Sequence, residues 1–169
     1  MSGCDAAELA PWLAEAEARL AQAGCAHVLI GGAVVQLYGL RARTRDVDFL
    51  VKASPDEFDR LPERLSDPVL RIQRKAPWHL RMWRGEQYAD LILAEMEVQQ
   101  GIVDAAQHRT VAGRSMPVAR PEDMIVLKML AGRPQDRRDV AEIQEHIPNL
   151  DHATIAQKLA EFGIAWPCD

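Results

Sequence analysis

Two stretches decide the fold: LIGGAVVQLYG, residues 29–39, and RTRDVDF, residues 43–49. The first begins in a short apolar and partly β-branched run, which predicts a buried strand at residues 27–30. The strand is followed directly by a glycine pair and then by residues 33–38, which predict a short helix. The second stretch leads into residues 46–52, an apolar run that predicts a second strand and carries two carboxylates.

The glycine pair, Gly31-Gly32, stands where the first strand meets the short helix. Glycine tolerates the backbone conformations of a tight turn, and a turn at the start of a helix directs backbone N–H groups toward an anion. The pair is therefore a candidate site for a triphosphate. The alternative is a tight turn with no ligand.

The acidic pair Asp46 and Asp48 carries the most chemical information. Residues two apart in a strand project from the same face, so the two carboxylates stand side by side. Adjacent anions repel unless a cation lies between them, and Mg²⁺ takes oxygen ligands that it shares with substrate phosphates. Most such pairs are solvated surface charges. Here the apolar neighbours Val47 and Phe49 predict a buried strand, where unpaired carboxylates are costly.

A third carboxylate, Asp90, interrupts another apolar run, residues 88–93. If this strand lies beside the strand of the acidic pair, the three carboxylates suit two metal ions about 3.5–4 Å apart. Two alternatives stay open. Asp90 caps a strand edge or pairs with an arginine, or else Glu95 or Glu97 supplies the third carboxylate.

The rest of the chain places helices at both ends and strands in the middle, which predicts a mixed α/β or α+β fold with one mixed sheet flanked by helices. We expect a single domain, 1–169, with a core at about 25–120 and a helical part at about 121–169. The helices are expected at residues 5–23, 54 to before 68, 121–130, 135–146 and 151–162, and further strands at 69–73, 78–84 and 88–94. Residues 111–118 predict a short extended or hairpin segment. Gly85-Glu86 predicts a hairpin turn.

Composition excludes several classes of protein. The net charge of -5 and the pI near 5.5 argue against a broad basic surface for duplex nucleic acid. Three widely spaced cysteines match neither a zinc site nor a disulfide framework, which fits a cytoplasmic location. The sequence has no apolar run of transmembrane length and no signal-peptide pattern at its start, so we expect no membrane association.

Together these motifs resemble the nucleotidyltransferase superfamily, whose signature is a strand, a Gly-Gly or Gly-Ser turn, a short helix and an acidic pair on the next strand. The stretches 31–39 and 43–49 look most like the AbiEii-type nucleotidyltransferases, many of them toxins of toxin–antitoxin pairs. A C-terminal lysine followed by an Arg-Asp stretch also matches, as LKMLAGR at 127–133 and RRDV at 137–140. The resemblance covers about residues 25–145.

The resemblance implies a role for each matching residue. Asp46, Asp48 and Asp90 would hold Mg²⁺ or Mn²⁺, with Asp90 also acting as base. The predicted nucleotide-binding residues are Gly31, Gly32, Arg43, Thr44, Lys128 and Asp139. Lys128 would reach the phosphates and Asp139 would orient it, although Lys128 can also extend to solvent and Asp139 can belong to a solvated face. Many active transferases carry serine where this chain has Gly32, so phosphate binding would rely on backbone donors.

The predicted reaction is metal-dependent transfer of a nucleoside monophosphate from a nucleoside triphosphate to an acceptor hydroxyl. The candidate acceptors are a tRNA end, a protein side chain and a small molecule, and a cognate antitoxin is a candidate partner. Trp78 and Trp83 lie among arginines, a mixture that stacks single-stranded bases, or they belong to a core or interface. The rival hypotheses are a noncatalytic nucleotide-binding or antitoxin-like module, and a structural domain whose three aspartates do not converge.

Overall fold

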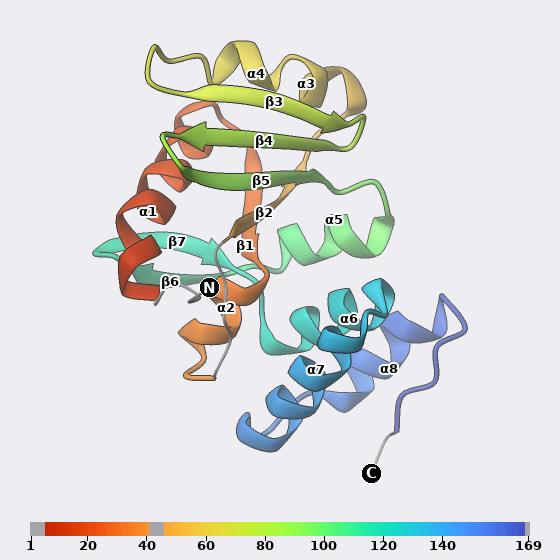
Figure 1. Cartoon of the computed structure of the whole chain (residues 1–169). Helices are drawn as coiled ribbons and strands as arrows, with labels where there is room; N and C mark the ends of the chain where they lie inside the picture. The colour runs from red at the N-terminus through yellow and green to blue at the C-terminus, as the bar shows by residue number, and fades with distance from the viewer. Residues whose placement is uncertain (1–5, 41–45, 168–169) are drawn as a thin grey trace.

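Strands β1 (Ala26–Ile30) and β2 (Val47–Lys52) form the centre of the sheet in the computed structural model, which describes residues 6–40 and 46–167. The described residues form one seven-stranded sheet in the order β3-β4-β5-β2-β1-β7-β6 (Figure 1). β2 runs antiparallel to β1 and parallel to β5, and β1 runs parallel to β7. The sheet is mixed and flanked by helices, so the predicted fold class is confirmed.

The outer strands come in two antiparallel sets. β4 pairs with both β3 and β5, and β6 pairs with β7 at the opposite edge. Gly85-Glu86 connects β4 to β5, as the hairpin prediction required. The bounds are β3 (Arg71–Ala76), β4 (His79–Arg84), β5 (Gln87–Leu93), β6 (Gln107–Val111) and β7 (Arg114–Val118).

Helices cover the sheet and form a separate group at the C-terminal end of the chain (Figure 1). α1 contacts β1 and β5, α5 contacts β1 and β2, and α6 packs against both α7 and α8. The bounds are α1 (Ala6–Gln22), α2 (Gly32–Leu37), α3 (Pro55–Asp59), α4 (Leu61–Arg64), α5 (Glu97–Asp104), α6 (Pro121–Ala131), α7 (Pro134–His146) and α8 (His152–Ala160). None of the helices in the described ranges has the length and apolar character that a bilayer crossing requires.

The alternation of side chains along β2 separates the core from the candidate site. Val47, Phe49 and Val51 are fully buried, and Phe49 meets the ring of His27, which lies against Glu17 of α1. This face of the sheet therefore packs on α1. Because side chains alternate along a strand, Asp48 projects from the opposite face.

The helix expected from Ser54 to before Pro68 begins as predicted but does not continue. Ser54 and Glu57 form the predicted capping box at the start of α3. The prediction of one helix is wrong, because the structure has two short ones that meet at Arg60. Pro62 explains the break, since it has no N–H to donate to the carbonyl of Phe58.

Candidate active site

Strand register brings the three predicted carboxylates together. β2 and β5 run parallel with Asp48 directly opposite Asp90, and Asp46 lies immediately before β2, two residues from Asp48. The Tyr88 hydroxyl donates a hydrogen bond to Asp46. The aspartates therefore share one face at the same end of two neighbouring strands. A structural domain with scattered acids does not fit this arrangement.

Register also distinguishes the candidates for the third carboxylate. Glu95 and Glu97 follow the end of β5 and are exposed. At about 3.3 Å per residue, Glu95 lies roughly 16 Å beyond Asp90 along the chain. Asp90 is therefore the acidic residue of this segment that lies beside Asp48.

Asp48 is a desolvated carboxyl group beside two other acids. Burial, together with the charges of Asp90 and Asp46, raises its pKa to about 7, whereas the charges of Arg133 and Arg81 oppose the shift. No side chain in the described part of the chain forms a hydrogen bond or ion pair with Asp48. Among the described residues, the ionised form of Asp48 thus has no direct cationic partner, as expected of a carboxylate that binds a metal ion.

Asp90 is held by two neighbours on β4. The guanidinium of Arg81 donates to both of its oxygens, through Nε and Nη2 at 2.7 Å each, and His79 Nε2 lies 2.8 Å from Oδ1. Burial raises the pKa of Asp90, but the hydrogen bonds from Arg81 and His79 outweigh it and hold the pKa below the usual value. The alternative that Asp90 pairs with an arginine is therefore also observed, together with its position beside Asp48.

The Arg81–Asp90 pair gives a stability prediction. Replacing Arg81 with methionine leaves a largely buried carboxylate with only His79, so we expect a loss of about 3 kcal/mol in the free energy of unfolding. The matched control is Arg84→Met, which breaks an ion pair between Arg84 and Glu15 and should cost at most about 1 kcal/mol because Arg84 is half-exposed. Urea unfolding measures both, and equal losses would contradict this assignment.

Aromatic rings and arginines form a stack beside the carboxylates. The guanidinium of Arg81 lies 3.9 Å from the ring centre of Tyr88, and Arg71 lies 5.0 Å from that of Trp83. Trp83 is partly buried, whereas Trp78 is 43% exposed and stacks on His79. Neither tryptophan belongs to the fully buried core, and the prediction that they stack on bases stays a prediction.

Gly31 is the point of closest approach between the turn and the acidic pair. Its φ is +77°, and a Cβ atom at this position would lie 2.2 Å from Asp48 Oδ2. The neighbouring Gly32 begins α2. Only glycine fits beside this carboxylate, so the Gly31 turn and Asp48 form one site.

A pair of glycine substitutions tests this contact. Gly31→Ala combines a left-handed backbone conformation with a collision on Asp48, and we expect it to cost about 3 kcal/mol or more of stability. Gly39→Ala is the matched control, because its φ is +80° but a Cβ atom there meets open space, so about 1 kcal/mol of backbone strain is expected. If urea unfolding gives equal losses, the close contact with Asp48 has no energetic effect.

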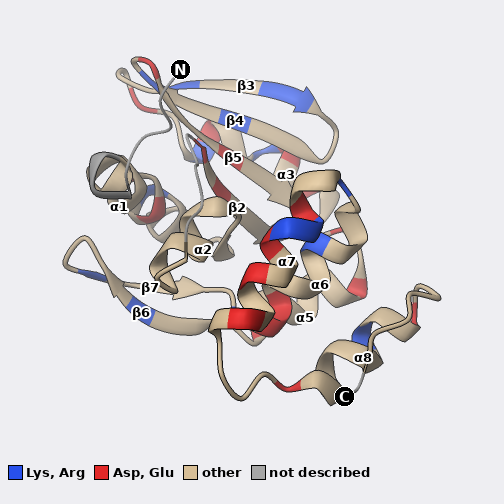
Figure 2. Ribbon diagram, turned by 60° about the horizontal axis from the view of Figure 1, so that its bottom comes forward, with Lys and Arg blue, Asp and Glu red and all other residues tan. Residues whose placement is uncertain are grey.

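The C-terminal helices carry basic and acidic residues near one another (Figure 2), and several of these residues form a chain of ion pairs. Lys128 on α6 is nearly buried, and its Nζ bonds to Asp139 and lies 3.6 Å from Asp136, both on α7. Asp136 in turn accepts from Arg133 Nε at 2.7 Å. Lys128 and Asp139 are therefore brought together, as predicted.

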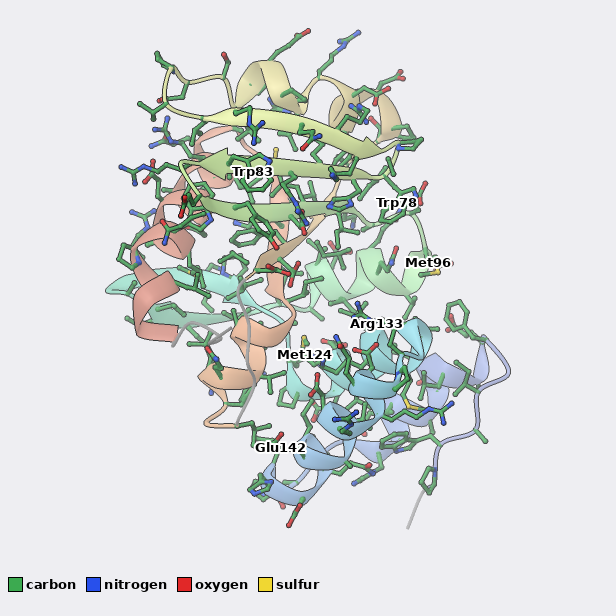
Figure 3. All side chains as sticks on the ribbon, viewed as in Figure 1. Trp78, Trp83, Met96, Met124, Arg133 and Glu142 are labelled. Atoms are coloured by element: carbon green, nitrogen blue, oxygen red, sulfur yellow. The ribbon has the colours of Figure 1, made fainter. Side chains whose placement is uncertain are left out.

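The sequence motifs assigned no role to Arg133, the residue that begins this chain of charges. Arg133 is the N-cap of α7, and Figure 3 shows it at the end of the helical group nearest α5 and the sheet. Its charge acts on Asp48. The local sequence Arg133-Pro134-Gln135-Asp136 does predict a helix start with Asp136 at N3, but it does not reveal that this start faces the acidic pair. The predicted residues Arg43 and Thr44 lie outside the described residues.

The acidic pair offers what a magnesium or manganese ion requires. Asp46 and Asp48 present carboxylate oxygens from one face, and Asp48 has an elevated pKa that a nearby cation would lower. Within the described ranges no group of three or more His, Cys, Asp or Glu side chains is arranged to hold a metal ion. Asp90 bonds to Arg81 instead, so the residues fit a metal ion at Asp46 and Asp48 with substrate oxygens completing its shell.

Comparison with solved structures identifies this architecture. The antibiotic-resistance factor ANT(2″)-Ia is 15% identical with a TM-score of 0.64, and the match covers 94% of this chain and 93% of that one. The chain has a nucleotidyltransferase fold. An antigenic nucleotidyltransferase-like protein from Paracoccidioides brasiliensis matches with 17% identity and a TM-score of 0.62, covering 92% of this chain and 87% of that chain. The lincosamide antibiotic adenylyltransferase LnuA, lincomycin-bound, matches with 18% identity and a TM-score of 0.54, covering 78% of this chain and 94% of that chain.

Sequence comparison adds a partial match. The family model described as "Nucleotidyl transferase of unknown function (DUF2204)" matches residues 91–164, from β5 to just beyond α8. No curated protein matches the chain in sequence. The nucleotidyltransferase fold is thus supported by structure and by family model. The AbiEii-type resemblance covers about residues 25–145, and its glycine and acidic motifs at residues 31–49 lie outside this match, so it stays a prediction.

Proposed function

We propose that this protein transfers a nucleoside monophosphate from a nucleoside triphosphate to an acceptor hydroxyl, with a divalent metal ion bound at Asp46 and Asp48. The observation that carries the proposal is the register of β2 and β5, which sets Asp48 opposite Asp90 and next to the Gly31 turn. A nucleotidyltransferase fold and a match to a nucleotidyl transferase family model support it.

Each part of the site has a distinct task in this reaction. Asp46 and Asp48 would hold Mg²⁺ or Mn²⁺, which supplies charge stabilisation at the phosphate and lowers the pKa of a bound hydroxyl. The turn at Gly31 and Gly32, which lies against Asp48, would bind the triphosphate through its backbone N–H groups. Asp90 would act as the base that takes the proton from the acceptor hydroxyl.

Base catalysis by Asp90 requires a rearrangement. A carboxylate that accepts two hydrogen bonds from one guanidinium is a weak base, because its protonation would weaken these charge-assisted hydrogen bonds. We therefore propose that Arg81 moves away from Asp90 when metal and substrates bind.

The acceptor is defined here only as a hydroxyl compound. LnuA is an antibiotic adenylyltransferase, and another similar structure contains adenylyl-2″-tobramycin. Small hydroxyl-bearing molecules therefore stay among the acceptor classes to test, together with tRNA and protein side chains. A toxin role with a cognate antitoxin rests on the AbiEii resemblance alone.

The test is label transfer. Each nucleoside triphosphate, labelled at the α-phosphate, is incubated with wild-type protein, Mg²⁺ and, separately, total RNA, total protein and a small-molecule extract. We expect the α-phosphate label to be transferred to one of these fractions, and no label to be transferred when the nucleotide is labelled at the γ-phosphate. Absence of transfer to every fraction, with all four nucleotides, would contradict it.

A noncatalytic nucleotide-binding module is the second candidate, and the Arg81–Asp90 pair favours it. If Arg81 holds Asp90 permanently, the carboxylate is a structural partner and the site lacks its base. This candidate predicts nucleotide binding without label transfer, and it also predicts that Asp90→Asn leaves nucleotide binding unchanged.

A further inference from the structure

We propose that Arg133, and not Lys128, is the residue of the C-terminal helices that binds the nucleotide triphosphate, and that Asp136 and Lys128 position it. This inference rests on the proposed function. It names a residue that neither the sequence motifs nor the comparisons assign.

Arg133 is held in place while one side of its guanidinium stays open. Nε and Nη2 donate to the two oxygens of Asp136, at 2.7 and 3.3 Å. Nη1 forms no hydrogen bond with any residue in the described ranges, and the side chain is 65% exposed. A guanidinium fixed along one edge and open along another is preorganised to donate to a phosphate oxygen.

Lys128 has the opposite surroundings. Its side chain is 10% exposed, and its ammonium group lies between the carboxylates of Asp139 and Asp136. To reach a phosphate, Lys128 would have to leave the buried carboxylate of Asp136 and the partly exposed carboxylate of Asp139. Its positive charge instead balances the negative charge of Asp136, which also forms an ion pair with Arg133. Lys128 therefore supports the arginine through Asp136.

The position of Arg133 fits a triphosphate that lies between the two halves of the molecule. The arginine lies at the corner between α6 and α7, at the end of the helical group that is nearest α5 and the sheet (Figure 3). On the sheet, Asp48 adjoins the Gly31 turn. Phosphates placed at that turn, with a metal ion on the acidic pair, would meet the open edge of Arg133.

The experiment uses inorganic tripolyphosphate with Mg²⁺ as a probe that has no base, followed by isothermal titration calorimetry. The full-length wild type is compared with Arg133→Ala, Arg133→Lys and the matched control Arg137→Ala, an exposed arginine of the same helix. We expect Arg133→Ala to weaken binding about ten- to hundredfold, Arg133→Lys to restore part of it, and Arg137→Ala to change it less than twofold. Circular dichroism melting confirms that each variant is folded.

Asp136→Asn tests the positioning role. It should weaken binding less than Arg133→Ala does, and the double variant should bind no more weakly than Arg133→Ala alone, because Asp136 acts only through the arginine. If wild type binds and Arg133→Ala binds equally well, the inference is overturned while the proposed function stands. If folded wild type fails to bind both tripolyphosphate and all four nucleotides, the proposed function fails and the inference fails with it.

Discussion

Replacing Asp46 or Asp48 with alanine is expected to lower the rate of nucleotide transfer by about three orders of magnitude. Stabilisation of transition-state charge by a metal ion amounts to several kcal/mol, and each 1.36 kcal/mol corresponds to a factor of ten. Both carboxylates project from one face beside the Gly31 turn, so loss of either removes a metal ligand. The rate of pyrophosphate release, in the presence of the acceptor fraction that takes up label, measures the effect.

Asp104→Ala is the matched control for this prediction. Asp104 is an exposed carboxylate at the end of α5 that pairs with Lys52, and its loss should leave the rate within a factor of two. A tenfold or smaller decrease in both acidic-pair variants would show that these carboxylates do not hold a catalytic metal ion.

The second large effect concerns stability and pH. The pKa of Asp48 is about 7 in the folded chain against an ordinary value of 3.8. Between these values the folded state binds more protons than the unfolded state, so stability falls as pH rises and the full cost is present above pH 7. Asp48→Asn removes this cost. We therefore compare the free energy of unfolding of the Asp48→Asn variant with that of wild type in metal-free buffer. The difference in favour of the variant should be larger at pH 8 than at pH 5 by about 3 kcal/mol, since each pKa unit corresponds to 1.36 kcal/mol.

Urea unfolding at the two pH values, with EDTA present, measures this gain. Glu86→Gln, in the exposed turn between β4 and β5, is the control and should show the same pH dependence as wild type. A gain that stays constant from pH 5 to pH 8 would show that Asp48 titrates as an ordinary carboxylate.

Local patterns were sufficient for much of the fold. The two central strands, the glycine turn between β1 and α2, and the capping box of Ser54 and Glu57 depend on neighbours in sequence, and all are confirmed. The helix split at Pro62 is also a local effect that was missed. The arrangement of Asp48 opposite Asp90 is different, because it depends on the register of two strands separated by a hairpin and two helices.

The Arg81–Asp90 pair could have been predicted. A two-residue turn at Gly85-Glu86 pairs Arg84 with Gln87, and counting back along the hairpin places Arg81 opposite Asp90. The role of Arg133 could not have been predicted in this way, because it depends on how the C-terminal helices pack relative to the sheet. No periodicity or motif in the sequence specifies that packing.

Binding of a nucleoside triphosphate together with a divalent metal ion, at the acidic pair and the Gly31 turn, underlies the proposed function. It can be measured by calorimetric titration of each of the four nucleotides into wild-type protein, once with Mg²⁺ and once with EDTA. We expect saturable binding of at least one nucleotide that requires Mg²⁺ and is lost in the Asp46→Ala, Asp48→Ala double variant. Failure of all four nucleotides to bind, or binding that the double variant retains, would contradict it.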